Sequence, residues 1–181
     1  AVALHPQVAG RLDAIVKVVI RTHESALRII DKKGTLHNPA DRDHCLQYMF
    51  AVALIHGRLR SEDYEDEAAA DPRIDTLREK IIVIEEKRFS VDYLDPDKRS
   101  IANGVQIFFD DGTHTAEVIL EYPIGHSRRR TEGIPVLVEK FRTHLAQRFS
   151  ADRQAKILDC SLDVDRLSAM PVNDYLDLYA S

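Results

Sequence analysis

Residues 41–57 read DRDHCLQYMFAVALIHG, and their apolar side chains recur at the spacing of an α-helix. Pro39 and Asp41 stand where such a helix begins, and Gly57 stands where it ends. Apolar residues occupy nearly the whole circumference, which is typical of a helix that is buried on both sides. The sequence therefore predicts one helix between two layers of structure, and the rest of the chain is organised around it.

One face of this helix carries polar side chains in its first two turns. His44 and Tyr48 fall on the same side one turn apart, nearly opposite Leu46 and Ala53. Both can transfer protons, so near a helix N-terminus they would suit one wall of an active site. The alternative is that His44 and Tyr48 are satisfied interface residues, and spacing alone favours this second interpretation.

The composition is that of a soluble globular protein. The 181 residues are 44% hydrophobic and 30% charged, with a formal net charge of −5. No apolar run approaches the roughly 20 residues of a membrane helix, and the first residues lack the basic start of a signal peptide. No extended basic tract is present, so nucleic acid is not expected as the main partner. Because the chain begins with Ala1 rather than Met, we expect it to start inside a longer protein.

Cysteine and histidine usage gives no indication of a metal centre. Cys45 and Cys160 are isolated, which favours free thiols in a reducing compartment. An iron–sulfur cluster takes about four thiolates, so this chain alone is not expected to hold one. The histidines show no ligand spacing such as His-Glu-x-x-His, and the sequence has no glycine-rich phosphate loop. We assign no metal.

Apolar periodicity divides the rest of the chain into short strands and helices. Strands are predicted over 15–22, 81–86, 102–109 and 114–122, the last two joined as a hairpin by Asp110-Asp111-Gly112-Thr113. Helices are predicted over 4–12, 24–31, 71–80, 132–148 and 151–160, and the apolar tail 172–179 is expected to be docked. The pattern predicts one α+β domain over residues 1–181, a small mostly antiparallel sheet covered by helices.

A second candidate site is the segment YPIGHSRRR, residues 122–130, between a strand end and a helix start. Guanidinium groups bind carboxylates through two parallel hydrogen bonds, and free backbone N–H groups at a helix start also attract anions. The segment would therefore suit an anionic ligand. The alternative, a solvated basic turn, fits the sequence at least as well.

Several segments resemble the MmgE/PrpD family. The resemblance covers nearly the whole chain from about Ile15, and the segments that carry it are LHNPADRDHCLQYM at 36–49, DPRID at 71–75, DPDKRSIAN at 95–103, EYPIGHSRRR at 121–130 and MPVNDYLDLY at 170–179. It implies a cytoplasmic, cofactor-free lyase that removes water from 2-methylcitrate to give 2-methyl-cis-aconitate in the methylcitrate cycle of propionate catabolism. It also implies a large helical domain before a smaller α+β domain, with the active site between them, and a homodimer. This chain resembles only the smaller, C-terminal domain.

The resemblance also assigns site residues. The family's His-x-x-x-Tyr helix is matched by His44 and Tyr48, so Tyr48 is expected to act as an acid or hydrogen-bond donor that His44 orients. His126, Arg128 and Arg129 are expected to bind the carboxylates of a tricarboxylate substrate. The family's catalytic Lys and several of its His have no counterpart here, so the base would come from the helical N-terminal domain.

Two expectations and two alternatives follow from this division. The chain alone should be inactive, and the face bearing His44 and Tyr48 should be open to solvent while Leu46, Phe50 and Leu54 are buried. One alternative is a sibling enzyme of the same fold, such as a cis-aconitate decarboxylase or an isomerase. The other is a non-catalytic module that serves as a lid or a dimerisation surface.

Overall fold

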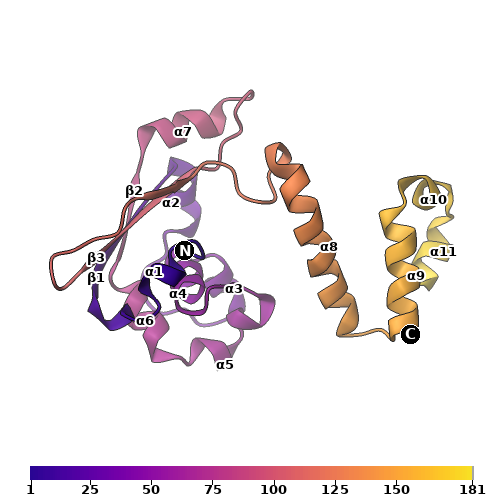
Figure 1. Ribbon diagram of the computed structural model, residues 1–181, viewed down its shortest axis with the longest axis horizontal. Helices are drawn as coiled ribbons and strands as arrows, with labels where there is room; N and C mark the ends of the chain where they lie inside the picture. Colours follow the sequence, from indigo (N-terminus) through magenta and orange to yellow (C-terminus); the bar gives the residue numbers. More distant parts are fainter. Residues whose placement is uncertain (181) are drawn as a thin grey trace. The chain divides into compact units, whose positions relative to one another are not determined.

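A computed structural model describes residues 1–180 and divides them into two compact units (Figure 1). The first unit comprises Ala1–Pro123, and the second begins at Ile124. The sequence predicted a single α+β domain and showed no boundary near Pro123, so the division differs from that expectation. The physical reason is that the helices after Ile124 pack on one another.

The first unit is built on a four-stranded mixed sheet, as the α+β prediction required. Its strand order is β2-β1-β3-β4; β1 pairs with β2 in parallel, and the other two pairings are antiparallel. The mostly antiparallel sheet is thereby confirmed, although β4 is shorter than predicted. The bounds are Ile15–Thr22 for β1, Ile81–Glu85 for β2, Asn103–Phe109 for β3 and Val118–Leu120 for β4.

The hairpin turn lies where the sequence placed it. Gly112 has a φ of 80°, in the left-handed region that favours glycine. Its N–H donates to the Phe109 carbonyl at 3.1 Å, and the Phe109 N–H donates to the Thr113 carbonyl at 2.9 Å. The Asp-Gly turn is therefore confirmed.

Short helices cover the sheet of the first unit. The predicted helices 24–31 and 71–80 are confirmed as α2 and α6, whereas α7 was not predicted, because only Phe89 and Asp92 of its eight residues are buried. The bounds are His5–Val8 for α1, Glu24–Ile30 for α2, Pro39–Asp43 for α3, Leu46–His56 for α4, Asp66–Ala69 for α5, Pro72–Arg78 for α6 and Lys87–Leu94 for α7, with short 3-10 turns η1 at Leu12–Ala14 and η2 at Ser61–Tyr64.

The helix α4 is the centre of the first unit's core. Eight of its eleven residues are buried, and Leu54 is completely enclosed. Six of them, all but Gln47 and Ala53, form one hydrophobic cluster with residues of α1, α6 and the sheet, including Val8, Ile74 and Ile107. Burial of the central helix on both sides is therefore confirmed, as is its end at Gly57.

The predicted helix is nevertheless broken near its start. The chain forms α3, leaves the helical conformation at His44 and Cys45, and resumes as α4, with Cys45 extended at φ −121° and ψ 107°. This break places Cys45 in the core and lets the Arg42 side chain reach the Tyr64 carbonyl at 2.7 Å. Apolar periodicity does not register such a break, because the core residues on either side keep their helical spacing.

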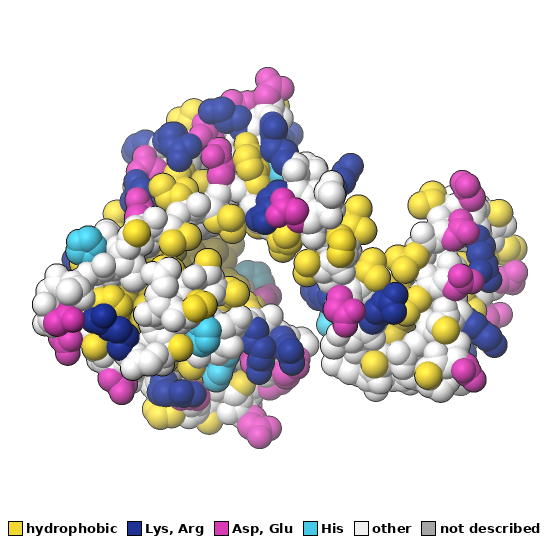
Figure 2. Space-filling view, in the orientation of Figure 1, with side chains coloured by type: hydrophobic (Ala, Val, Ile, Leu, Met, Phe, Trp, Pro, Cys, Tyr) yellow, Lys and Arg dark blue, Asp and Glu magenta, His cyan; other side chains and the backbone are white. Residues whose placement is uncertain are grey.

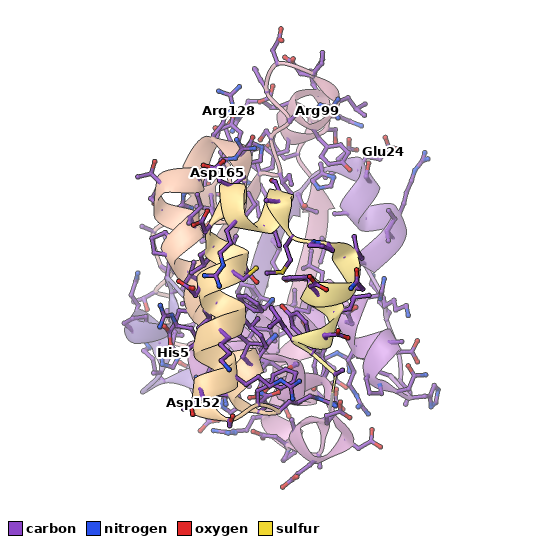
Figure 3. All side chains as sticks on the ribbon, turned by 90° about the vertical axis from the view of Figure 1, so that its right-hand side faces the viewer. His5, Glu24, Arg99, Arg128, Asp152 and Asp165 are labelled. Carbon is purple, nitrogen blue, oxygen red and sulfur yellow. The ribbon has the colours of Figure 1, made fainter. Side chains whose placement is uncertain are left out.

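The second unit is helical throughout the part that the structure describes. The predictions over 132–148 and 151–160 are confirmed as α8 and α9, although only Leu145 of the apolar stripe predicted in α8 is buried. The elements are η3 at Ser127–Arg129, α8 at Arg130–Ala146, α9 at Ala151–Leu162, α10 at Val164–Ala169 and α11 at Val172–Asp177. Figure 3 looks onto α9 and α10, where Asp152 and Asp165 are labelled.

The C-terminal tail is docked within this unit, as expected. The Tyr175 hydroxyl lies 3.1 Å from the Ser161 hydroxyl and 2.8 Å from the Tyr179 hydroxyl. Arg153 Nε donates to the Leu178 carbonyl at 2.8 Å. Burial and the hydrogen bond with Tyr175 raise the pKa of Tyr179 to about 12.

We expect Gly57→Ala to destabilise the chain more than Gly112→Ala. Both glycines have a left-handed φ, 68° and 80°, a conformation that costs an L-residue about 1–2 kcal/mol. A Cβ at Gly57 would lie 2.8 Å from the His5 ring, whereas a Cβ at Gly112 meets nothing within 4 Å among the described residues. Moving His5 also threatens its 2.7 Å hydrogen bond to the Leu54 carbonyl, worth about 1 kcal/mol. Urea unfolding of both variants measures the difference, and equal losses would contradict it.

We expect His23 to make the stability of the chain fall at acidic pH. His23 is buried at the N-terminus of α2, stacks on Tyr93 with ring centroids 4.2 Å apart, and accepts the Ala26 N–H. Burial lowers the pKa of His23 below 6.5. As pH falls, the unfolded state therefore binds a proton at His23 before the folded state does. The stability that neutral His23 contributes is complete above pH 6.5, and it is lost as pH falls through the pKa of the folded state. His23→Asn keeps the capping acceptor without titrating, so its unfolding free energy should depend less on pH between 7 and 5. Parallel profiles would refute the assignment.

Candidate functional site

Tyr48 is enclosed by residues of the first unit. Its side chain is 2% exposed, and its hydroxyl donates to the Asp63 carbonyl at 2.7 Å. The expectation that this face is open to solvent was wrong. The reason is that the chain turns at Gly57 and returns as η2, which places the Tyr64 ring 6.2 Å from the Tyr48 ring.

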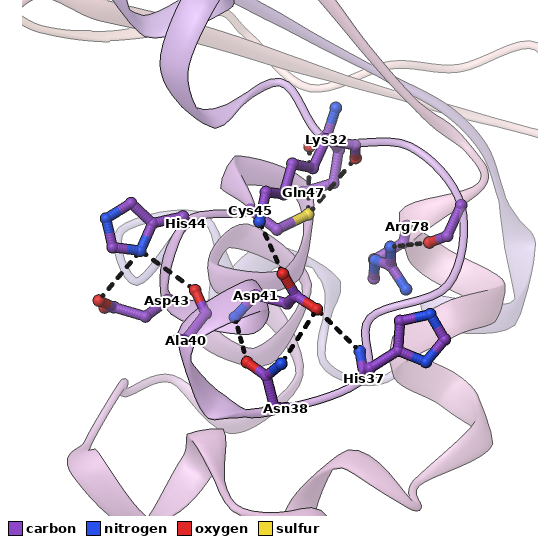
Figure 4. Close-up of polar contacts among 11 residues, drawn as sticks. Lys32, His37, Asn38, Ala40, Asp41, Asp43, His44, Cys45, Gln47 and Arg78 are labelled. Atoms are coloured by element: carbon purple, nitrogen blue, oxygen red, sulfur yellow. Dashed lines mark hydrogen bonds and ion pairs between the residues drawn. The ribbon is translucent and has the colours of Figure 1, made fainter.

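His44 does not share a face with Tyr48. It lies at the break between α3 and α4, where its ring is exposed. Its Nδ1 lies 3.1 Å from the Ala40 carbonyl and 3.5 Å from the Asp43 carboxylate (Figure 4). The expected pairing, in which His44 orients Tyr48, depended on a continuous helix, and the break separates the two side chains.

Tyr48 instead lines a pocket of about 660 Å³ within the first unit. The pocket lies between the loop after α2, the helices α4 and α6, and the strand β2. Its charged lining comprises the basic Lys32, Lys33, Arg42 and Arg78 and the acidic Asp75 and Glu79. Lys32, Arg42 and Arg78 each form an ion pair within the first unit, with Asp41, Asp66 and Asp75 respectively.

The loop on one side of the pocket is held at several points (Figure 4). Arg78 Nη2 donates to the Gly34 carbonyl at 3.0 Å, and Lys32 Nζ donates to Asp41 at 2.9 Å. The Asp41 carboxylate also accepts the His37 N–H at 3.1 Å, and these bonds, led by that from Lys32, lower the pKa of Asp41. The pocket wall is therefore ordered by charge pairs rather than by apolar packing.

Two buried groups give the pocket its electrostatic character. Arg78 forms an ion pair with Asp75, and its Nε is buried without a hydrogen-bond partner within residues 1–180. Burial raises the pKa of Tyr48, while the charge of Arg42 opposes this effect. Tyr48 thus remains a neutral phenol at physiological pH, which can donate a hydrogen bond or a proton.

Apart from Tyr48, the charged residues that line this pocket were missed by the sequence analysis. Lys32, Lys33 and Gly34 form a short basic loop just before the helix start at Asn38-Pro39, and this was the one available signal. Arg78 lies 44 residues beyond Gly34, and it approaches this loop because α6 packs against α4 and β2 pairs in parallel with β1.

His126, Arg128 and Arg129 come together on one turn of the second unit. His126 Nδ1 accepts the Arg128 N–H at 3.1 Å, and Arg129 pairs with Glu132 at 2.7 Å. The hydrogen bond that Arg129 donates to Glu132 raises the pKa of Arg129. The predicted position before a helix start is confirmed, because α8 follows directly; Arg128 is labelled in Figure 3. His44 and Tyr48 belong to the first unit and these three residues to the second.

The surface of the first unit in view carries interspersed basic and acidic side chains (Figure 2). Residues 1–180 contain no group of three or more His, Cys, Asp or Glu that is arranged to hold a metal ion. In the same residues, no helix combines the length and the apolar character needed to cross a membrane. Cys45 and Cys160 are both buried free thiols, as predicted.

Comparison with known proteins shows where this arrangement belongs. The family model of the MmgE/PrpD C-terminal domain matches residues 1–166, which cover the first unit and the second unit as far as residue 166. The chain is 60% identical over 174 residues to a 2-methylcitrate dehydratase of Salmonella typhimurium and 59% identical over 174 residues to one of Escherichia coli. Each match covers 96% of this chain and 36% of the relative.

The similarity extends beyond enterobacteria. A 2-methylcitrate dehydratase of Cupriavidus necator is 61% identical over 95% of this chain, and a mitochondrial 2-methylcitrate dehydratase of Yarrowia lipolytica is 56% identical over 92% of it. The chain spans 36% and 32% of those two proteins, or about a third of their length. The chain belongs to the MmgE/PrpD family, as its C-terminal domain.

Proposed function

We propose that this chain is the C-terminal part of a 2-methylcitrate dehydratase, a hydro-lyase that removes water from 2-methylcitrate to give 2-methyl-cis-aconitate in propionate catabolism. The observation that carries the proposal is the identity of about 60% over 96% of the chain with curated proteins of that name. An identity this high over both units supports the same substrate rather than that of a sibling decarboxylase or isomerase.

The chemistry of the pocket supports this assignment. Elimination of water needs a base for the proton beside a carboxylate, an acid for the departing hydroxyl, and cations for the tricarboxylate. Tyr48 is a neutral phenol on the pocket wall and is the proposed acid or hydrogen-bond donor. Lys32, Lys33 and Arg78 would attract the carboxylates within the first unit.

The remaining site residues have narrower roles. His126, Arg128 and Arg129 are proposed to bind a carboxylate at the start of α8. His44 has Ala40 and Asp43 as its contacts, so we do not give it the task of orienting Tyr48. The base is proposed to lie in the part of the enzyme that this chain does not span.

The partner that supplies the base is proposed to be a helical N-terminal domain of the same protein. The second unit supports a need for such a partner, because Ile134, Val136 and Leu137 on α8 are more than half exposed. We also propose a homodimer and a cytoplasmic location. Because the relative of Yarrowia lipolytica is mitochondrial, the cellular compartment of the full-length protein should be measured.

We expect the 181-residue chain alone to show no turnover of 2-methylcitrate, because its pocket provides cations and an acid but not the base. The measurement is the absorbance of the unsaturated product, with the full-length enzyme as positive control and circular dichroism to establish that the chain is folded. Turnover by the 181-residue chain close to that of the full-length enzyme would contradict a base outside this chain. If the full-length enzyme converted cis-aconitate but not 2-methylcitrate, it would be a sibling enzyme.

We expect Tyr48→Phe in the full-length enzyme to lower kcat by about 10²–10⁴-fold, the usual effect of losing a positioned acid. The variant also loses the hydrogen bond to Asp63, which should cost about 1 kcal/mol of stability. Tyr93→Phe is the matched control, because Tyr93 stacks on His23 outside the pocket. A normal kcat with a lowered Tm would make Tyr48 a structural residue.

A further inference from the structure

The hydroxyl of Tyr48 is bound by the main chain of η2, fifteen residues further along the chain. Its acceptor is the Asp63 carbonyl, at 2.7 Å, and the next residue, Tyr64, uses its carbonyl to accept Arg42 Nη1 at 2.7 Å. Two side chains that line the pocket therefore end on successive carbonyls of one turn. The position of this turn determines where both side chains point.

The Asp63 carboxylate joins the start of this turn to Arg58 and Arg60. Asp63 Oδ2 accepts the Arg60 N–H at 2.7 Å, and Arg58 Nη1 lies 2.9 Å and 2.7 Å from the two carboxylate oxygens. The Asp63 side chain is 7% exposed and that of Arg58 is 42% exposed. Arg58 thus approaches from the surface, and neither Arg58 nor Asp63 lines the pocket.

We propose that Asp63 and Arg58 are positioning residues for Tyr48, which together fix the position of its phenol oxygen through the Asp63 carbonyl. This inference rests on the proposed function, since it gives that reaction's acid a fixed geometry. Arg58 acts through Asp63, and Asp63 acts through its own carbonyl oxygen.

The chemistry of a phenol makes this position consequential. A phenol oxygen offers one hydrogen to donate and two lone pairs to accept. In the structure the hydrogen lies on the Asp63 carbonyl, and to act as the acid Tyr48 turns this hydrogen from that carbonyl to the departing hydroxyl of the ligand. A loosened turn would let the phenol oxygen shift, and a misplacement of about 1 Å can cost up to ~100-fold in rate.

The kinetic test uses the full-length enzyme and the variant Arg58→Met. We expect kcat to fall about tenfold with KM nearly unchanged, and Arg58→Lys to recover most of the rate because an ammonium also pairs with Asp63. In a Tyr48→Phe background, Arg58→Met should lower kcat no further, because the turn then has no hydroxyl to direct. Arg11→Met is the control: it removes an arginine of similar exposure from its ion pair with Asp111 on the hairpin, and should leave kcat unchanged. Equal rate losses in both backgrounds would overturn the proposal.

A second measurement needs no turnover. The hydroxyl proton of Tyr48 in the 181-residue chain, labelled at tyrosine, should exchange slowly with water by NMR, and Arg58→Met should accelerate that exchange while Arg11→Met should not. Fast exchange in the unmodified chain, or no change in Arg58→Met, would overturn the positioning role even if the dehydratase assay succeeds. Slow exchange that responds to Arg58, combined with a full-length protein that does not dehydrate 2-methylcitrate, would instead locate the failure in the proposed function.

Discussion

The burial of α4 on every side constrains the rest of the first unit. A helix with eight of eleven residues buried needs cover around its whole circumference, and no single neighbouring element provides it. The sheet, α1 and α6 each take one part of that surface, and η2 covers the part that carries Tyr48. A residue placed in the middle of such a helix is therefore held by several elements at once, which makes α4 a rigid support for a functional side chain.

The same constraint explains why the pocket is polar. Residues of α4 and β2 line one part of the pocket, and both elements also contribute to the hydrophobic core. The rest of the lining comes from the loop after α2 and from α6. Those walls meet through Arg78, Gly34, Lys32 and Asp41, whose charges and main-chain groups replace apolar packing. The pocket is thus a seam between apolar layers, and charge-assisted hydrogen bonds are the interactions that order it.

Much of the fold could be predicted from local sequence. The strand Ile15–Thr22 is β-branched and regular, the Asp-Gly turn requires a left-handed glycine, and Gly57 ends a helix in the same conformation; each signal is contained in a few neighbouring residues. The break at Cys45 was not predictable in this way, because it accompanies a contact of Arg42 with Tyr64, twenty-two residues away. The enclosure of Tyr48 by η2 and the approach of Arg78 to Gly34 accompany contacts of the same kind. The resemblance located Tyr48, but only tertiary contacts show which groups surround it.

The parallel pairing of β1 with β2 has a consequence for how the pocket forms during folding. The two strands pair from Val18 with Ile81 to Thr22 with Glu85, so residues 23–80 form one long crossover between them. Nearly every pocket residue lies in that crossover, and the others, Ile81, Ile82 and Val83, lie on β2 itself. Closing so long a loop carries an entropic cost that is recovered only when the crossover packs. The pocket and the sheet should therefore assemble in one cooperative step, with no folding intermediate that has the sheet but lacks the pocket.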